Sequence, residues 1–299
     1  MTQLSGVVLV DKPVGPTSHD VVAAVRRAVG QKRVGHAGTL DPLAEGLLLV
    51  LLGSATRLAE YLVGHDKAYC TEARLSIETD TYDTEGRVTR QWTGDLPSDA
   101  EIGRALAGFV GPLLQTPPAY SAVKVGGQPL HRLARRGTAT PVAPRRVTIH
   151  SLDWRRLGPE HIVLHVHCSA GTYIRSLVHD LGAALGCGAH VTRLRRIQSG
   201  PFSVEDALPL SEALERLADG DERVLLGPAA ALPHWPRINL GPEEVAGLRL
   251  GRAVSGPRPQ TEAMHLAVGP DGDVVAIVAR DSELELWRPR KVFSEEIAG

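Results

Sequence analysis

The sequence predicts an α+β fold, in which helices and hairpins are mixed around a central mixed β-sheet. Residues 67–77 and 162–168 alternate between apolar and polar side chains, which is the period of a half-buried strand. Residues 18–29 and 174–185 instead carry apolar side chains at helical spacing. Because helices and strands do not alternate regularly along the chain, we expect a mixed α/β sheet rather than a doubly wound parallel one.

The N-terminal part is expected to supply the centre of this sheet. Gly6–Val10 predicts a buried strand, and Leu47–Leu52 is apolar without interruption, which is typical of a central strand. Between them, Ser18 is expected to cap a helix that ends at Gly30. The other expected elements are a helix at about 55–62 before Gly64, a helix from the Ser98–Glu101 capping box to about Gly111, a strand at 120–125 with a turn at 126–127, and a strand at 190–197.

A change in character after Ala231 predicts a second structural unit. Leu232–Pro236 has the composition of a linker, and the sequence beyond it is rich in turns and short strands, with a hairpin around residues 270–273. We therefore divide the chain into residues 1–234 and a small β-rich domain at residues 235–299. A length of 299 residues suits two such domains.

Composition narrows the class of protein. No apolar run is long enough to span a membrane, and the N-terminus lacks the pattern of a signal peptide, so we expect a soluble cytoplasmic protein. Apolar residues make up 43% of the chain, enough for a normal core. The cysteines are odd in number and form no CxxC pattern, so we expect reduced packing residues at Cys70, Cys168 and Cys187.

The distribution of charge says more than the net charge of −1. Acidic residues are absent between Glu101 and Asp153 and again between Asp180 and Glu205, whereas arginines occur in both stretches. Such basic blocks suit contact with phosphates. An arginine-rich surface that only faces water would give the same pattern, so charge leaves both interpretations open.

Residues 35–46, Gly-His-Ala-Gly-Thr-Leu-Asp-Pro-Leu-Ala-Glu-Gly, form the most informative segment. Its glycines and its proline can do little to pack a core, and they favour a defined loop. Such a loop would hold one carboxylate and one imidazole, Asp41 and His36, on a rigid scaffold. The alternative is a turn in which Asp41 bonds only its own backbone.

Five separated segments resemble, in order, the motifs of bacterial TruB-type pseudouridine synthases. One such match alone is a weak signal, but five in order are specific. The resemblance covers roughly the first 200 residues, and the C-terminal part resembles an RNA-binding PUA domain less strongly. The segments are Asp11–Pro13, the loop around Asp41, Asp66–Tyr69, Gly171–Arg175, and Leu194–Arg196 with Gly200–Phe202.

The resemblance implies a pseudouridine synthase fold with a catalytic cleft, and a reaction on tRNA. Uridine 55 in the T-loop would be isomerised: the C1′–N1 bond breaks, the uracil turns, and C5 bonds to C1′. The stacked target must first be flipped out of the RNA. The resemblance implies no cofactor and no metal. The expected partner is the tRNA T-stem-loop, with no membrane, no obligate protein partner and a monomeric enzyme.

The resemblance also assigns three catalytic residues. Asp41 would act as nucleophile on C1′ or as base on the sugar, and the sequence leaves both roles open. Arg175 would pair with Asp41 and hold it ionised. Tyr69 would stack on the flipped base and help to exchange the C5 proton, although a core tyrosine would fit its strand equally well.

Four further residues are expected to bind the substrate. Tyr173 would support the floor of the pocket, and Leu194 would line it while also serving as a core leucine. His36 would fill the space that the target nucleotide leaves in the RNA. Lys12 would bond a carboxylate or a phosphate, or support the first strand.

Two metal-like patterns are rejected. His161, His165 and His167 share one strand face, but no nearby cysteine or carboxylate completes a zinc site. Residues 80–86 resemble a calcium loop but lack its alternating acids and terminal glutamate, so we expect a hairpin tip there.

Two positions depart from the family pattern. Ser76 stands where the family often has glycine, and His131 where it often has tyrosine. Neither belongs to the expected catalytic set, and the resemblance implies an RNA-clamping insert at about 121–146.

Two other functions compete. One is a dyskerin-type synthase that depends on guide RNA, and the other is a tRNA-binding folding chaperone with secondary catalysis. The string Asp-Pro-Leu-Ala-Glu-Gly and the lack of basic extensions favour the stand-alone enzyme, and an intact Asp41, Tyr69 and Arg175 favour catalysis.

Overall fold

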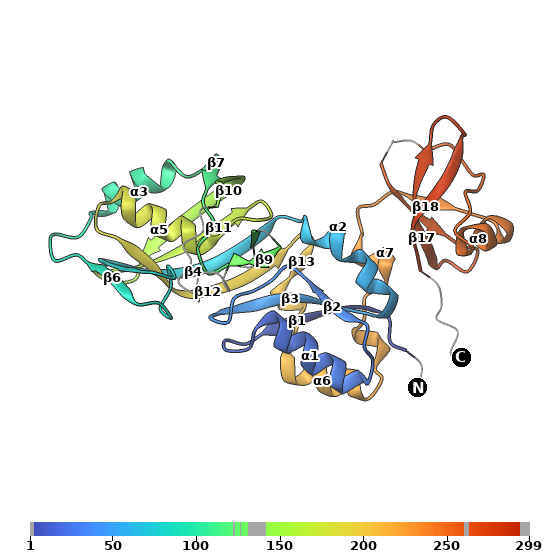
Figure 1. Ribbon diagram of the computed structural model, residues 1–299, viewed down its shortest axis with the longest axis horizontal. Coiled ribbons are helices and arrows are strands. Elements are labelled where there is room, and N and C mark those ends of the chain that lie inside the picture. The colour runs from blue at the N-terminus through green and yellow to red at the C-terminus, as the bar shows by residue number, and fades with distance from the viewer. Residues whose placement is uncertain (1–2, 122, 126, 131–141, 260–262, 294–299) are drawn as a thin grey trace.

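The computed structural model describes residues 3–121, 123–125, 127–130, 142–259 and 263–293 (Figure 1). Its largest part is one sheet of ten strands, whose order is β14-β1-β3-β12-β4-β11-β10-β7, with β2 beside β3 and β13 beside β12. Most pairs are antiparallel, but β12 runs parallel to β3 and β14 parallel to β1. The predicted mixed sheet is thereby confirmed. Its strands are β1 (Gly6–Lys12), β2 (Val34–Ala37), β3 (Ala44–Leu52), β4 (Lys67–Leu75), β7 (Gly111–Gln115), β10 (Arg145–Arg156), β11 (His161–Cys168), β12 (Ala189–Ser199), β13 (Phe202–Ser203) and β14 (Leu208–Pro209).

Strand β3 explains the uninterrupted apolar run. Leu48, Val50 and Leu52 belong to the core on one face of the sheet, and Leu47, Leu49 and Leu51 to the core on the other. Burial on both faces removes the need for polar side chains at alternate positions. The expectation of a central strand at Leu47–Leu52 is confirmed, and this strand begins three residues earlier, at Ala44.

Four helices cover one face of the sheet. In Figure 1, α1 (Ser18–Val29) and α6 (Leu210–Ala218) lie side by side along the β1–β3 half of the sheet. Helices α3 (Asp99–Ala107) and α5 (Ile174–Ala184) lie along the β4–β11 half. All four contribute buried apolar side chains to a single core with that face. The other helices among the described residues are α2 (Ala59–Val63), α7 (Pro228–Ala231), α8 (Pro242–Arg249) and the 3₁₀ turns Gly53–Leu58, Val204–Asp206 and Glu222–Val224.

Several helix boundaries differ from the prediction. Thr17, not Ser18, caps α1 by a capping box with Asp20, and Ser18 is instead the buried first residue of the helix. The expected helix at 55–62 is a 3₁₀ turn followed by the short α2. Helix α3 ends at Ala107, and Gly111 already begins β7.

The alternating strand expected at 67–77 ends early, at Leu75. Ser76 has a φ of +74°, in the left-handed region that favours glycine, and this residue turns the chain into β5 (Ile77–Thr79). That backbone conformation gives a physical reason for a preference for glycine here. Strand β5 pairs with β6 (Val88–Gln91), so residues 80–86 form a hairpin tip, as predicted.

Only the end of the strand expected at 120–125 is observed, as β8 (Lys124–Val125), which pairs with β9 (Gln128–Pro129). Residues 122, 126 and 131–141 of the expected insert, which include His131, Arg132, Arg135 and Arg136, lie outside the described residues. Arg145 and Arg146 belong to β10 and pair with β7.

A second, four-stranded sheet follows the connector at 232–236 and has its own core. Leu266, Ile277 and Phe293 of this unit also join the core on the face of the large sheet opposite α1, and Lys291 Nζ lies 2.6 Å from Glu60 Oε1. The hairpin expected around 270–273 joins β16 to β17 and is confirmed. The strands are β15 (Arg237–Asn239), β16 (His265–Val268), β17 (Val274–Asp281) and β18 (Leu286–Val292).

In the part of the chain that the structure describes, no helix is both long and apolar enough to cross a membrane. Cys70, Cys168 and Cys187 are unpaired thiols, the last two of them buried, as expected of packing residues.

Candidate active site

A cavity of about 270 Å³ opens where the Asp41 loop, β4, β12 and the start of α5 meet. Five of the seven predicted site residues line it, so side chains far apart in the sequence share one space. They are Asp41, Tyr69, Tyr173, Arg175 and Leu194.

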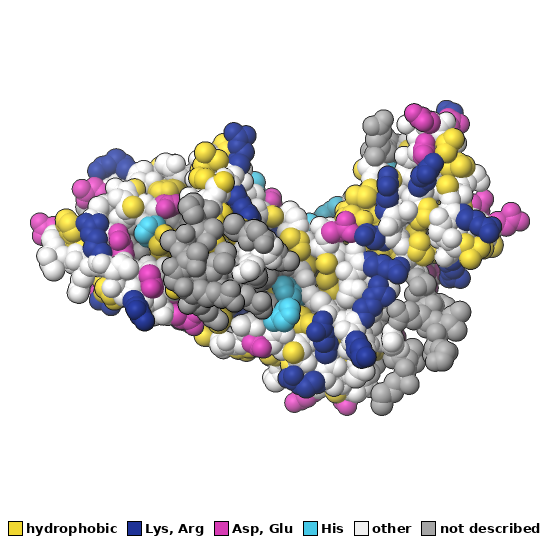
Figure 2. Space-filling model, viewed as in Figure 1, with side chains coloured by type: hydrophobic (Ala, Val, Ile, Leu, Met, Phe, Trp, Pro, Cys, Tyr) yellow, Lys and Arg dark blue, Asp and Glu magenta, His cyan; other side chains and the backbone are white. Residues whose placement is uncertain are grey.

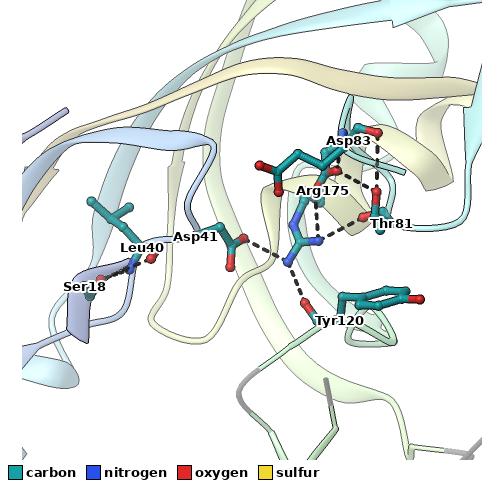
Figure 3. A network of polar contacts seen from close by, with 8 residues as sticks. Ser18, Leu40, Asp41, Thr81, Asp83, Tyr120 and Arg175 are labelled. Atoms are coloured by element: carbon teal, nitrogen blue, oxygen red, sulfur yellow. Dashed lines mark hydrogen bonds and ion pairs between the residues drawn. The ribbon is translucent and has the colours of Figure 1, made fainter. Parts of the chain in front are cut away.

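The loop that carries Asp41 is shorter than the sequence suggested. It spans residues 38–43 between β2 and β3, because residues 34–37 and 44–46 are paired in strands. Ser18 at the start of α1 fixes the peptide before Asp41: its Oγ accepts from Leu40 N at 2.8 Å and lies 3.1 Å from Leu40 O, to which it donates (Figure 3). Gly15 N donates to Pro42 O at 2.8 Å on the other side.

Arg196 ties the same loop to the sheet, and its role was not predicted. Its guanidinium, almost fully buried, donates to Gly38 O at 2.9 Å and to Leu47 O at 2.7 Å. Gly46 has a φ of +102°, and a Cβ there would lie 2.3 Å from Arg196 O, so β3 and β12 approach closely only because this residue is glycine.

Arg175 lies at the centre of the polar contacts, on the first turn of α5 (Figure 3). Its Nη2 donates to Asp41 Oδ2 at 2.9 Å and to Tyr120 O at 2.8 Å. Its Nη1 donates to Asp83 Oδ2 at 3.0 Å and to Thr81 O at 2.9 Å. A single buried guanidinium therefore holds two carboxylates and two carbonyls.

Asp83 was missed as a site residue, although the acidic segment 80–86 was visible in the sequence. That segment was correctly read as a hairpin tip, but the tip folds back against α5. Thr81 Oγ1 donates to Asp83 Oδ1 at 2.6 Å and Glu85 N donates to the same oxygen at 3.0 Å. No spacing in the sequence signals a contact between residues 83 and 175.

The pKa of Asp41 is raised above its ordinary value, although Arg175 acts to lower it, as expected of a guanidinium that favours the ionised form. Burial raises the pKa of Asp41 and the charge of Asp83 raises it further, while Arg175 and Lys12 act in the opposite direction. The net direction is upward because burial outweighs the guanidinium. About a third of the Asp41 side chain, 34%, still reaches solvent through the cavity.

Tyr69 and Leu194 are core residues and cavity residues at once. Both are buried, with 9% and 6% exposure, and both line the cavity. Burial raises the pKa of the Tyr69 phenol, while the charge of Arg196 acts in the opposite direction. The structure therefore places both residues in the core and in the cavity wall, while the stacking and proton-exchange roles of Tyr69 stay predictions.

Tyr173 precedes α5 as its N-cap residue, so the helix begins at Ile174, where the helical spacing was predicted to start. Its backbone is fixed by the Gln115 side chain, which accepts from Tyr173 N at 2.7 Å and donates to Tyr173 O at 3.1 Å. This bridge holds the start of α5 against β7.

Lys12 and His36 do not line the cavity. Lys12 is fully buried, and its Nζ donates to Pro13 O and Pro16 O at 2.8 Å each. Burial lowers the pKa of Lys12 to about 8, against the pull of Asp41. His36 lies in β2 rather than in the loop, and burial lowers its pKa below the usual value.

The described ranges contain no cluster of three or more His, Cys, Asp or Glu residues arranged to hold an ion. Lys67 is a further cavity residue that was not predicted; its Nζ donates to Val63 O at 2.6 Å, and burial lowers its pKa to about 8.

The fold that carries this cavity is shared with solved structures. A solved structure described as "Crystal Structure of a Cbf5-Nop10-Gar1 Complex" is similar over 97% of this chain and 85% of that one, with a TM-score of 0.73 and 28% identity. Another, "Structure of H/ACA RNP bound to a substrate RNA containing 2'-deoxyuridine", has a TM-score of 0.72 and 26% identity over 97% of this chain and 85% of that one.

Sequence comparison gives the family. Residues 26–174 match the model described as "TruB family pseudouridylate synthase (N terminal domain)", and residues 175–228 match the "tRNA pseudouridylate synthase B C-terminal domain". The "tRNA pseudouridine synthase B" of Heliobacterium modesticaldum is 43% identical over 98% of this chain and 96% of its own length. That of Syntrophotalea carbinolica is 44% identical over 83% of this chain and 81% of its own. The chain belongs to the TruB family of tRNA pseudouridine synthases, which are isomerases of uridine in tRNA.

Proposed function

We propose that this enzyme isomerises uridine 55 in the T-loop of tRNA, without a cofactor, after flipping the nucleotide into the cavity beside Asp41. The observation that carries the proposal is the Asp41 carboxylate, held 2.9 Å from Arg175 Nη2 in the wall of a cavity shared with Tyr69 and Leu194. A cavity of about 270 Å³ has room for one base that has been flipped out of the RNA, whereas a base that is still stacked within the RNA cannot enter it.

The reaction needs an ionised carboxylate beside the sugar. Arg175 fixes the Oδ2 atom of Asp41, and the partial exposure of the side chain leaves it within reach of a nucleotide in the cavity. Asp41 then attacks C1′ or removes a proton from the sugar, and either step breaks the C1′–N1 bond. The freed uracil turns, and its C5 bonds to C1′; this step displaces Asp41 from C1′ in the first route and returns the proton to the sugar in the second. The C5 proton then leaves, and N1 takes up a proton.

Apolar surfaces enclose the base during this rotation. The Tyr69 ring and the Leu194 side chain line the cavity together, and a ring offers stacking without restricting rotation about the base normal. Because Tyr69 is buried, with 9% exposure, its surroundings hold the ring in place before RNA arrives.

The RNA outside the cavity would contact basic side chains. Figure 2 shows Lys and Arg side chains in a line from the C-terminal unit across the region of α2 to α1. Arg26, Arg27 and Lys32 are exposed near α1, and Arg290 is exposed on β18. We take residues 235–299 as a PUA-like RNA-binding domain that continues this surface.

Replacing Arg290 by Gln tests this surface. If Arg290 contacts a phosphate, the slope of log affinity against log salt concentration should fall by about one unit or less. An unchanged slope would remove Arg290 from the interface.

The comparisons favour the stand-alone enzyme over the guide-RNA form. Relatives at 43% and 44% identity are named for tRNA, whereas the structures named for Cbf5 or H/ACA complexes share 26–28% identity. We therefore propose a monomer that needs no protein partner and acts on cytoplasmic tRNA.

The test uses tRNA that carries tritium at C5 of uridine, because forming the C5 glycosidic bond must release that hydrogen. Wild-type protein should release tritium from position 55 and retain activity after treatment with a metal chelator. Asp41→Asn keeps the shape of the side chain but loses its charge, so it should bind tRNA and release no tritium. Substantial turnover by a pure Asp41→Asn sample would reject the role of Asp41. Release from a different uridine would reject position 55. Tritium release by neither protein, together with intact tRNA refolding, would instead support the chaperone.

A further inference from the structure

Tyr82 has an unusual backbone for an aromatic residue. Its φ of +64° lies in the left-handed region, where a bulky side chain is rare unless the surroundings hold it. It occupies the hairpin tip between Thr81 and Asp83, the two residues of that tip that contact Arg175. The strained position therefore lies directly beside the polar network of the site.

The Tyr82 side chain is stacked on His179. The two ring centroids are 3.8 Å apart and the ring planes differ by 12°. His179 follows Arg175 by four residues on α5, so both side chains project from the same side of the helix. Helix α5 thus contacts the hairpin tip at two successive turns, through Arg175 and through His179.

The Tyr82 backbone is fixed as well. Its N–H donates to Thr79 O at 3.2 Å, and its carbonyl accepts from Val191 N of β12 at 3.0 Å. With the chain turned in this way, Thr81 O and Asp83 Oδ2 face the same atom, Arg175 Nη1, while the Tyr82 ring faces α5.

We propose that Tyr82 and His179 are positioning residues of this synthase, whose stack holds the hairpin tip so that Thr81 and Asp83 fix the Arg175 guanidinium against Asp41. The inference rests on the proposed catalytic role of Asp41 with Arg175. Neither ring lines the cavity, so they act through Arg175 and not on the base.

The test measures the single-turnover rate of tritium release at saturating tRNA, together with tRNA affinity. Tyr82→Ala and His179→Ala should each slow tritium release by about 5- to 10-fold and leave tRNA affinity unchanged. This factor corresponds to the stabilisation that a stacked aromatic pair provides. The double variant should be no slower than either single one, because both remove the same contact. Tyr82→Phe keeps the ring and should keep the rate.

Two further variants separate the stack from backbone strain and from general stability. Tyr82→Gly relieves the left-handed backbone but removes the ring, so it should be as slow as Tyr82→Ala. Trp92→Ala is the control for stability, because Trp92 packs under Arg90 on the same hairpin, away from its tip; it should lower the melting temperature and leave the rate unchanged. A normal rate for Tyr82→Gly, or multiplicative losses in the double variant, would overturn the proposal.

Asp41→Asn and Asp83→Asn, run in the same assay, keep the two hypotheses apart. If both retain the wild-type rate, the proposed function of the site fails. If both lose it while Tyr82→Ala and His179→Ala remain at the wild-type rate, only the positioning role of the stack fails.

Discussion

The Asp41 loop and the Asp83 hairpin tip each present one carboxylate to the same guanidinium, but the two carboxylates differ in solvent exposure and in hydrogen bonding. Asp83 is 3% exposed, and besides Arg175 it accepts from the Thr81 hydroxyl and the Glu85 amide. Asp41 is 34% exposed and is held by Arg175 through Oδ2. The comparison indicates a division of roles: the saturated carboxylate fixes the guanidinium, and the accessible one remains available for chemistry.

The two carboxylates are also coupled electrostatically. The charge of Asp83 raises the pKa of Asp41, while the charge of Arg175 between them lowers it. Asp83 therefore opposes the ionised form of Asp41 through its charge and supports its placement through Arg175. Substitutions at each position can separate these two effects.

Removing the shared cation should have the largest effect. Arg175→Met keeps an elongated side chain but leaves the carboxylate without the donor that places it, so the single-turnover rate should fall by about 100-fold or more. It also leaves Asp83 buried without its cation, which should cost about 3 kcal/mol of unfolding free energy. Tritium release and urea unfolding measure the two losses.

The double variant Arg175→Met/Asp83→Asn sharpens this result. Neutralising Asp83 removes the unpaired buried charge, so stability should recover in part while the rate stays low. Loss of tRNA affinity with an unchanged rate in Arg175→Met would instead make Arg175 a phosphate contact.

Asp83→Asn should have a smaller effect, with a distinctive pH dependence. Loss of one charged hydrogen bond to Arg175 should slow the reaction by about 10-fold. In the wild type, kcat/KM should fall as the pH falls through the raised pKa of Asp41, hence at a pH above the ordinary aspartate value of 3.8. In Asp83→Asn one cause of the raised pKa is gone, so this acidic limb should move to lower pH. A profile of kcat/KM for both proteins checks the direction, and a shift to higher pH would contradict the coupling.

The smallest effect is expected at Ser18, whose hydroxyl holds the Asp41 loop at Leu40. Ser18→Ala removes two hydrogen bonds to the Leu40 peptide, and the rate should fall by about 5-fold, with about 1–2 kcal/mol lost in stability. Thr17→Ala is the matched control, because it removes the cap of the same helix at a cost of about 1 kcal/mol without touching Leu40. Equal rates for the two variants would show that Ser18 serves only the helix.

Sequence patterns predicted the parts of the fold that depend on local physics. The continuous run Leu47–Leu52 predicted the central strand, because burial on both faces leaves no polar position. Five residues that the family motifs assigned to the site line one cavity, and their roles in it stay predictions: Asp41, Tyr69, Tyr173, Arg175 and Leu194. The end of β4 at Ser76 was not predicted, since a left-handed serine carries no mark in the alternation around it.

Long-range contacts account for most of what the sequence could not show. Asp83 lies in a turn-forming acidic segment that has a sufficient local explanation, and only the packing of the hairpin tip against α5 gives it a second role. Arg196 looked like one more member of a basic block, yet it is buried and bonded to Gly38 and Leu47. The upward shift in the pKa of Asp41 likewise depends on burial, which no motif encodes.

The position of β12 also determines when the site can form during synthesis. This strand, at Ala189–Ser199, is inserted between β3 and β4, and it supplies Leu194 and Arg196 to a cavity whose first wall is the loop at 38–41. The ends of the cavity are therefore separated by more than half of the chain, and closing such a contact is slow compared with forming local helices and hairpins. A ribosome-bound chain that ends before Ala189 should carry Asp41 and Tyr69 and yet bind no T-loop RNA. Binding should appear only when the chain has extended far enough for β12 to leave the exit tunnel.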